Sequence, residues 1–312
     1  MQAAARMLTQ RGVALVLVLW ALVLLTVIAG SFSFGMRTEA VLAQNLVASA
    51  RARALADGAV HRGIYELLKP EIDAAKWKPD GKVHPWEAGD AKIRVVITGE
   101  SGKLDINTAS DVLLKGLFQS AGLGEAESIA LLDAILDWRD TDDLRRANGA
   151  ELADYVAAGS KYAPPNALFA TLEELQQVMG MSPALYRRIR GSLTIFSGQQ
   201  GINPALASRQ VLLAIPGVEA SQVDAYIAQR QEYIDSGQPP PPFPFASGFA
   251  SAGPDSAFFL RAEVKLGNGG FFVREAVVGL AQDRKRPFRI FSWKEGDAAE
   301  QALEPKVMDV NK

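Results

Sequence analysis

The chain has 312 residues, which is enough for a sizeable core and for more than one structural unit. Its 33 basic and 35 acidic residues nearly cancel, so no overall electrostatic field attracts nucleic acid or acidic lipid. There is no cysteine, which suits either a reducing compartment or an exported protein that is stabilised in other ways. The two histidines, His61 and His84, fit no catalytic or zinc-binding pattern.

The first feature along the chain is a long uncharged stretch. Residues 12–36 contain no ionisable side chain, and Arg6 and Arg11 precede them. At about 1.5 Å per residue, a helix over this stretch spans roughly the 30 Å of bilayer hydrocarbon. A cleaved secretory signal, a signal anchor and a prepilin-like signal cut after Gly12 all begin in this way. The stretch exceeds the apolar region of an ordinary secretory signal, which favours the last two interpretations.

The positions of the arginines predict the orientation of this segment. Arg6 and Arg11 lie before the apolar stretch, and the next basic residue is Arg37. Basic residues are retained on the cytoplasmic side of a membrane. The N-terminus is therefore predicted to be cytoplasmic and the rest of the chain to lie outside.

The membrane helix is predicted to continue into the soluble part. Residues 37–69 contain no proline, and apolar residues recur there at spacings of three and four. Pro70 is expected to end the helix. A single helix of roughly 55 residues and about 80 Å therefore fits better than two helices joined by a linker. The apolar residues on its predicted inner face are Leu42, Leu46, Val60, Ile64, Leu67 and Leu68.

Strand patterns flank a helical block. Residues 76–90 are rich in turn residues, and 92–98 alternate as a strand does. Strand patterns return at 257–266, 271–281 and 288–293, after a proline-rich loop at 237–255. The predicted fold class is α+β, in which the long helix packs on one antiparallel sheet and a helical block is inserted between the strands.

The block from residue 107 to about residue 236 has a helical period. Asn107 or Thr108 is expected to cap its first helix, a second helix covers 125–138, and a third begins at Thr171. Ser182 and Pro183 are expected to open a fourth helix. Residues 106–139 and 202–230 repeat one pattern, with a partial third copy around Gly180, and this repeat resembles the helix-hairpin-helix module.

Helix-hairpin-helix modules bind DNA in some proteins and serve only packing in others. Residues 107–195 carry twelve acidic and eight basic side chains, a net charge of 8 − 12 = −4. Such a charge repels phosphate and removes the counterion release that drives DNA binding. The charge balance therefore favours a packing role over a DNA-binding role.

One polar constellation could bind a metal ion. Residues 137–143 are rich in aspartate, and Gly149 and Glu151 follow. Carboxylate oxygens are what calcium needs, although no EF-hand spacing occurs. The alternative is a solvated acidic loop neutralised by nearby arginines. The candidate calcium ligands are Asp140, Asp142, Asp143 and Glu151.

Five motifs together resemble one known family, type II secretion system protein K, the large minor pseudopilin. The resemblance covers nearly the whole chain and adds to the prepilin-like N-terminus. The motifs are Leu104-Asp105-Ile106-Asn107-Thr108-Ala109, Asp137-Trp138-Arg139-Asp140-Thr141-Asp142-Asp143, Gly149-Ala150-Glu151, Tyr162-Ala163-Pro164-Pro165-Asn166 and Phe169-Ala170-Thr171-Leu172-Glu173-Glu174-Leu175.

The resemblance implies a function and its processing. The family implies a non-enzymatic subunit at the tip of the periplasmic pseudopilus, anchored in the bacterial inner membrane, that initiates or regulates pseudopilus assembly. Prepilin peptidase is expected to cut between Gly12 and Val13, and Val13 is expected to be N-methylated. The implied partners are the minor pseudopilins I and J, with exported substrates as a further candidate contact, and the family has calcium sites. A membrane-anchored DNA-uptake protein is the alternative function.

The resemblance also divides the chain. It implies a pilin-like helix and sheet with an inserted, SAM-like helical domain. The expected parts are a leader over 1–12, the membrane part of the helix over 13–35, its periplasmic half over 36–70, a sheet domain from 71–106 and 254–295, the inserted domain with its linker over 107–253, and a flexible tail over 296–312.

One residue within the membrane stretch bears on the position of the subunit. Most pilins carry a glutamate at the fifth mature position, where its carboxylate can neutralise the amino terminus of the preceding subunit within lipid. Here that position is Leu17. A subunit with no other subunit ahead of it needs no such glutamate, so Leu17 is consistent with a place at the tip, and the resemblance implies the same departure.

Overall fold

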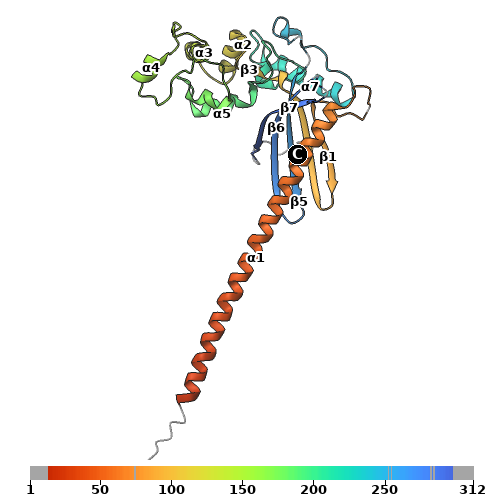
Figure 1. The fold of residues 1–312 in the computed structure, drawn as a ribbon. Coiled ribbons are helices and arrows are strands. Elements are labelled where there is room, and N and C mark those ends of the chain that lie inside the picture. Colours follow the sequence, from red (N-terminus) through yellow and green to blue (C-terminus); the bar gives the residue numbers. More distant parts are fainter. Residues whose placement is uncertain are drawn as a thin grey trace, which may run out of the picture.

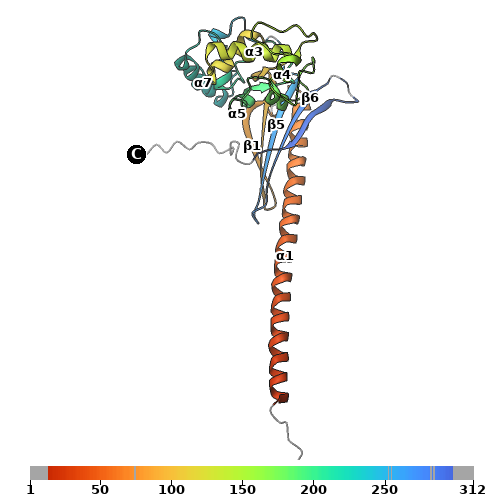
Figure 2. The same ribbon diagram turned by 90° about the vertical axis from the view of Figure 1, so that its left-hand side faces the viewer.

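The protein combines one very long helix, a five-stranded sheet and a helical domain (Figure 1). The computed structural model describes residues 13–73, 75–251, 253, 255–281, 283 and 285–297. Helix α1, Val13–Leu68, has 56 residues, so the single uninterrupted helix predicted from the sequence is confirmed. Figure 2 shows that about half of it projects well beyond the rest of the protein.

The projecting part of α1 is suited to a membrane. Its apolar side chains from Leu15 to Ile28 are all more than half exposed. Among the described residues, α1 is the one helix that is both long and apolar enough to cross a bilayer. Such exposure in water would be costly, whereas in lipid it is favourable.

The sheet is antiparallel, with strand order β1-β2-β5-β6-β7. Its first strand differs from the turns that the composition of residues 76–90 predicts. Pro85 lies within that strand and pairs with Arg94, which an edge strand tolerates because one of its sides needs no donor. The strands are β1 Asp80–Ala88, β2 Ala91–Gly99, β5 Ala257–Leu266, β6 Phe271–Leu280 and β7 Phe288–Glu295.

The upper half of α1 covers one face of this sheet. The helix contributes a row of small and aliphatic residues to a shared core with β2, β5 and β6. The predicted inner face was wrong at its lower end, because Leu42 and Leu46 are 56% and 72% exposed and burial begins only at Ala48. It was also wrong at Leu68, the last residue of the helix, which is 39% exposed. The buried residues of α1 are Ala48, Ala52, Ala56, Ala59, Val60, Ile64 and Leu67.

A partly buried ion pair also joins α1 to the sheet. Arg274 of β6 is 5% exposed, and its Nε lies 2.6 Å from Oδ1 of Asp57 on α1. Its guanidinium also lies over the rings of Phe272 and Trp293, at 4.9 and 5.3 Å. A guanidinium held in this way fixes both the height and the rotation of α1 against the sheet.

The inserted domain lies at the end of the molecule farthest from the projecting helix (Figures 1 and 2). Its first helix begins after Ser110, not after Asn107 or Thr108, and the Ser110 side chain makes no capping hydrogen bond. The segment after Thr171 is a 3₁₀ helix, Leu172–Gln177. Two short strands, β3 Leu104–Asp105 and β4 Leu193–Thr194, pair in parallel. The helices are α2 Asp111–Ser120, α3 Glu125–Arg139, α4 Leu152–Ala157, α5 Pro183–Ile189, α6 Arg209–Leu212 and α7 Ala220–Asp235.

The repeat predicted from the sequence is present as two helical hairpins. In the first, α2–α3, Arg139 donates to the carbonyl of Ile106, which precedes the hairpin. In the second, α6–α7, Arg230 donates to the carbonyls of Pro204 and Ala207, at 2.9 and 2.7 Å. Each hairpin is therefore closed by an arginine near the end of its second helix.

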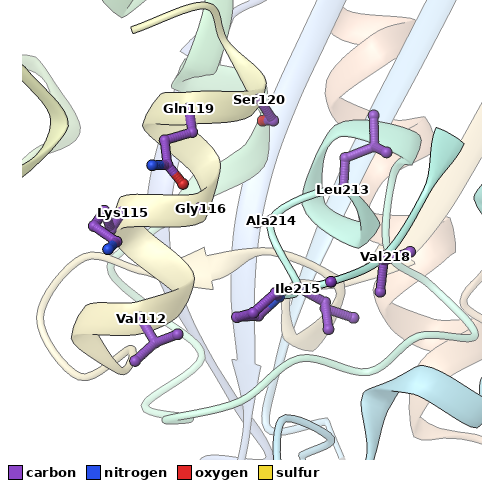
Figure 3. Close-up of a pocket in the computed structure, with 11 residues that line it drawn as sticks. Val112, Lys115, Gly116, Gln119, Ser120, Leu213, Ala214, Ile215 and Val218 are labelled. Carbon is purple, nitrogen blue, oxygen red and sulfur yellow. The ribbon is translucent and has the colours of Figure 1, made fainter. Parts of the chain in front are cut away.

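The two hairpins pack closely against each other. Figure 3 shows Gly116 of α2 facing Ala214, and a Cβ atom on Gly116 would lie 2.0 Å from the Ala214 carbonyl oxygen. A side chain at residue 116 would push the hairpins apart. A cavity of about 350 Å³ lies beside this contact.

The ion pair between α1 and the sheet gives a first prediction. Arg274→Ala leaves the partly buried Asp57 without its partner and removes the stacking on Trp293, so it should destabilise the protein by about 2–4 kcal/mol. The matched control is Arg51→Ala, because Arg51 and Asp90 form an ion pair whose side chains are 47% and 45% exposed. It should cost less than about 1 kcal/mol. Urea denaturation followed by tryptophan fluorescence measures both, and equal losses would contradict a tethering role for Arg274.

Candidate functional site

The predicted processing site lies at the border of the described structure. Gly12 is outside the described residues, and Val13 is the first residue of α1. The junction between Gly12 and Val13 therefore stays a prediction from sequence.

The sequence motifs from separate parts of the inserted domain meet around Trp138. The side chain of Asn107 donates to the Phe169 carbonyl and accepts from the Phe169 amide, at 3.0 and 2.9 Å. Trp138 is 2% exposed and packs on Phe169 and Tyr155, with ring centroids 6.1 and 5.8 Å away. An aromatic core thus joins the sequence motifs at 104–109, 137–143 and 169–175 beneath the acidic loop.

Asp137 fixes the start of the acidic loop. It is fully buried, and its two carboxylate oxygens accept from the amide of Arg146 at 3.3 and 3.2 Å. Gly149 passes directly beside it, because a Cβ atom there would lie 2.0 Å from Oδ2 of Asp137. Burial raises the pKa of Asp137, and the amide of Arg146 opposes that shift.

Glu151 is the most perturbed acid of the loop. It is 6% exposed, and neither of its carboxylate oxygens has a hydrogen-bond partner among the described residues. Burial and, in smaller measure, the charges of Asp137, Asp140, Asp143 and Asp142 together raise the pKa of Glu151 to about 7. A buried carboxylate without a partner is costly and calls for a proton or a cation.

Asp140 resembles Glu151 in part. It ends α3, and its Oδ1 is buried without a partner, while its Oδ2 lies 4.0 Å from Nη2 of Arg146. Burial, followed by the charge of Asp142, raises the pKa of Asp140. The carboxyl groups of Asp140 and Glu151 are therefore both surrounded by more negative than positive charge.

Asp142 and Asp143 hold the loop instead of pointing into the buried cluster. Oδ1 of Asp142 accepts from the amide of Leu144 at 2.9 Å. Oδ1 of Asp143 accepts from Nδ2 of Asn166 at 2.8 Å, and the same amide donates to the Asp142 carbonyl. Asn166 has a φ of 50°, which asparagine tolerates better than most residues. The motif that contains Asn166 is thus hydrogen-bonded to the acidic loop.

The four predicted calcium ligands do not form one coordination sphere in this structure. Across the residues that the structure describes, no group of three or more histidine, cysteine, aspartate or glutamate side chains is placed to hold a metal ion. Two of the predicted ligands, Asp140 and Glu151, carry unpartnered buried oxygens that suit an oxygen-binding cation. The prediction omitted Asp137, which its place within the apolar run 135–138 could have revealed as buried.

Acidic side chains lie next to both hairpin turns. Glu125 follows the first turn and Glu219 follows the second. Lys115 and Gln119, two of the residues that line the cavity in Figure 3, are both bonded to Glu125. The amides of the turns therefore lie beside negative charge, which opposes the binding of phosphate.

The two histidines are placed by packing. Nδ1 of His61 lies 2.8 Å from the Asp57 carbonyl oxygen, and its ring contacts Trp293. His84 stacks on Trp77 at 4.3 Å, and burial lowers its pKa. Both belong to the packing of α1 and the sheet.

The known proteins that this chain resembles share one name. Residues 96–198 match the family model of type II secretion system protein K. The protein of that name from Klebsiella pneumoniae is 25% identical over 228 residues, which cover 66% of this chain and 69% of the relative. The one from Aeromonas hydrophila is 26% identical over 206 residues, covering 58% and 62%, and the one from Dickeya chrysanthemi is 43% identical over 65 residues, covering 21% and 17%.

A solved structure shares the fold. A chain in the crystal structure of the GspK-GspI-GspJ complex from the enterotoxigenic Escherichia coli type 2 secretion system superimposes with a TM-score of 0.55 and 15% identity. The match covers 84% of this chain and 99% of that chain. The predicted resemblance to protein K and the predicted α+β, pilin-like fold are therefore confirmed.

The raised pKa of Glu151 predicts how stability depends on pH when calcium is absent. The folded protein holds the Glu151 proton more tightly than the unfolded chain does, so its contribution to stability falls as pH rises from about 4.5 to about 7. Glu151→Gln removes this loss. In chelator the variant should be more stable than the natural protein by an amount that grows with pH and levels off at about 3 kcal/mol. Urea denaturation at pH 5, 6, 7 and 8 measures it, and a constant difference would contradict the perturbed carboxyl.

Proposed function

We propose that this chain is a minor pseudopilin of the protein K type, a subunit of the type II secretion system for protein export across the outer membrane. The observation that carries the proposal is the combination of the pilin-like helix and sheet with an inserted domain whose motifs match protein K. Within that system the chain occupies the tip of the pseudopilus and initiates or regulates its assembly.

The structure of α1 supports a role in assembly. Its apolar part has no partner in the single chain, and exposed apolar residues continue past Met36 to Leu42, Leu46 and Val47. A helix in this state is available to pack against the helices of other subunits, first in the membrane and then in the fibre. The partners proposed here are the minor pseudopilins of the I and J types, because the similar solved chain is found in a complex named GspK-GspI-GspJ.

The position of the chain in the cell follows from the same helix. Arg6 and Arg11 precede the apolar stretch, which supports a cytoplasmic N-terminus and a periplasmic sheet and inserted domain. The chain crosses the inner membrane once. Leu17, which replaces a glutamate usual in pilins, suits a subunit that has no predecessor in the fibre.

The bulk of the inserted domain also suits the tip. It lies at the end of the molecule farthest from the projecting helix, where it blocks no subunit that packs below (Figures 1 and 2). The proposed role is non-enzymatic, and exported proteins are a further candidate contact. DNA binding is not favoured, because Glu125 and Glu219 follow the two hairpin turns directly.

Calcium is proposed as a ligand of the acidic loop. Glu151 and Asp140 would supply buried oxygens, and Asp142 and Asp143 would contribute after their loop moves. A bound cation would neutralise the carboxylates that now raise one another's pKa. Its role would be to hold the acidic loop in one conformation, in a chain that has no disulfide to do so.

N-terminal mass spectrometry of the protein from its host tests the proposed class. We expect a mature chain that begins with methylated Val13, because cleavage after Gly12 releases the apolar helix for assembly. Gly12→Leu should leave the leader attached, whereas Gly35→Leu, a matched change in the exposed part of α1 with no atom near its Cβ position, should not. An intact Met1 in the natural protein would contradict the proposal.

Thermal unfolding of the full chain in detergent tests calcium binding. Calcium at 100 times its Kd should raise the free energy of unfolding by about 2.7 kcal/mol, which shifts the melting temperature by several degrees. Glu151→Gln and Asp140→Asn should remove the shift. Asp224→Asn is the control, because Asp224 pairs with Arg209 in the second hairpin, away from the loop. No shift in the natural protein would leave a solvated acidic loop as the correct interpretation.

A further inference from the structure

Strand β7 leaves one side of the sheet open. It is the last strand in the order β1-β2-β5-β6-β7 and pairs only with β6 among the described residues. Figure 1 shows it at the edge of the sheet opposite β1. The backbone N–H and C=O groups along an outer edge are ready to pair with another extended chain.

The opposite edge is built differently. Strand β1 contains Pro85, which donates no backbone hydrogen bond, and its register is broken between Asp80 and Val83. Strand β7 has eight residues and no proline, which gives roughly 26 Å of edge. Its register with β6 shifts once, between Val277 and Val278. The edge of β7 is therefore the more accessible of the two.

The two faces of β7 differ in chemistry. Phe288, Ile290 and Trp293 lie opposite Leu280, Val278 and Ala276, on the side that faces α1. Ile290 is 40% exposed, so this apolar row continues to the outer edge. The other side carries Arg289 opposite Gly279 and Lys294 opposite Glu275. Phe291 lies between these two basic residues, over Gly279, and stacks on Phe196. An added strand would therefore meet an apolar row on one side, and Arg289 and Lys294 around Phe291 on the other.

The basic row extends into the hairpin before β7. Lys285, Arg286 and Arg289 are all exposed, and none has an ion-pair partner among the described residues. Lys294 reaches Glu275 only at 3.9 Å. Asp283 lies in the same hairpin, where its carboxylate accepts from the amide of Lys285, and Glu295 ends β7. The described residues between 283 and 295 therefore carry four basic and two acidic side chains, which leaves an excess of positive charge along this edge.

We propose that the outer edge of β7 binds an extended, acidic segment of a partner protein as a sixth strand. Main-chain hydrogen bonds would hold the segment, and its apolar side chains would extend the row of Phe288 and Ile290. Its acidic side chains would face Arg289 and the basic hairpin. A second copy of this chain is a poorer occupant, because two β7 strands would bring their arginines and lysines together. This contact is separate from assembly through α1.

A synthetic peptide tests the proposal with the full chain in detergent. The probe is a fluorescein-labelled peptide of eight residues in which valine alternates with glutamate, and fluorescence anisotropy measures its binding. Three results are expected. The peptide binds, a version with alternate backbone nitrogens methylated binds at least about tenfold more weakly, and a version with lysine in place of glutamate binds more weakly still.

Charge variants assign the binding to β7. Arg289→Glu should weaken binding of the acidic peptide by about fivefold or more and should lower its sensitivity to salt. Arg187→Glu is the matched control, because Arg187 is equally an exposed arginine but lies on α5 of the inserted domain. Equal effects of the two variants, or equal binding of the methylated peptide, would overturn the proposal.

The chain's own tail is tested in the same assay. If the acidic peptide binds only after residues 298–312 are removed, the tail is the occupant of the edge and the proposal of a partner protein is wrong. Sedimentation of the full chain across a range of concentrations tests whether a second copy binds this edge. Self-association that Arg289→Glu abolishes would also overturn the proposal of a partner protein.

Discussion

Helix α1 and the sheet each have an apolar face that the other buries, and the rest of the structure depends on this contact. The row from Ala48 to Leu67 on the helix meets the inner faces of β2, β5 and β6. Alanines make up much of this row, so the helix approaches the sheet closely, and Gly63 lets it approach further because a Cβ there would lie 2.6 Å from Leu260. The ion pair of Arg274 with Asp57 then selects one alignment. Because α1 is continuous, this alignment also sets the direction of the membrane segment relative to the sheet.

The inserted domain is attached to the sheet between two neighbouring strands. The chain leaves the sheet after β2 and returns at β5, and these two strands are neighbours, with Gly99 opposite Phe258. Oδ1 of Asp255 accepts from the amide of Ser101 at 3.0 Å and ties the exit to the return. A large insertion between adjacent strands leaves their register unchanged, which explains how one chain combines a pilin-like sheet with two helical hairpins. The acidic loop lies within this insertion and is held by Asp137, so its chemistry is separate from the contact between α1 and the sheet.

Much of this architecture could be predicted from the sequence, because it depends on local patterns. The absence of proline from 37–69 predicted one helix, and period-two alternation located β2, β5 and β6. Strand β1 was missed because its pairing with β2 outweighs its turn-like composition. Leu42 and Leu46 were placed inside because periodicity reveals an apolar face but not whether its partner belongs to the same chain. At the acidic loop, the composition showed the charge, but only the fold shows that Asp137 and Glu151 are buried while Asp142 and Asp143 bond to the loop itself.

The exposed apolar part of α1 that follows the proposed membrane segment is therefore the feature that most directly connects this structure with the proposed role in assembly. The chain has no cysteine, so Leu46→Cys introduces a single thiol on that surface. A thiol-specific cross-linker applied to host cells would report its neighbours. We expect a cross-link from residue 46 to another subunit of the secretion system, absent from Lys161→Cys on the inserted domain and lost from cells that lack the other minor pseudopilins. A chain that stays uncross-linked at residue 46 in secreting cells would contradict packing through α1.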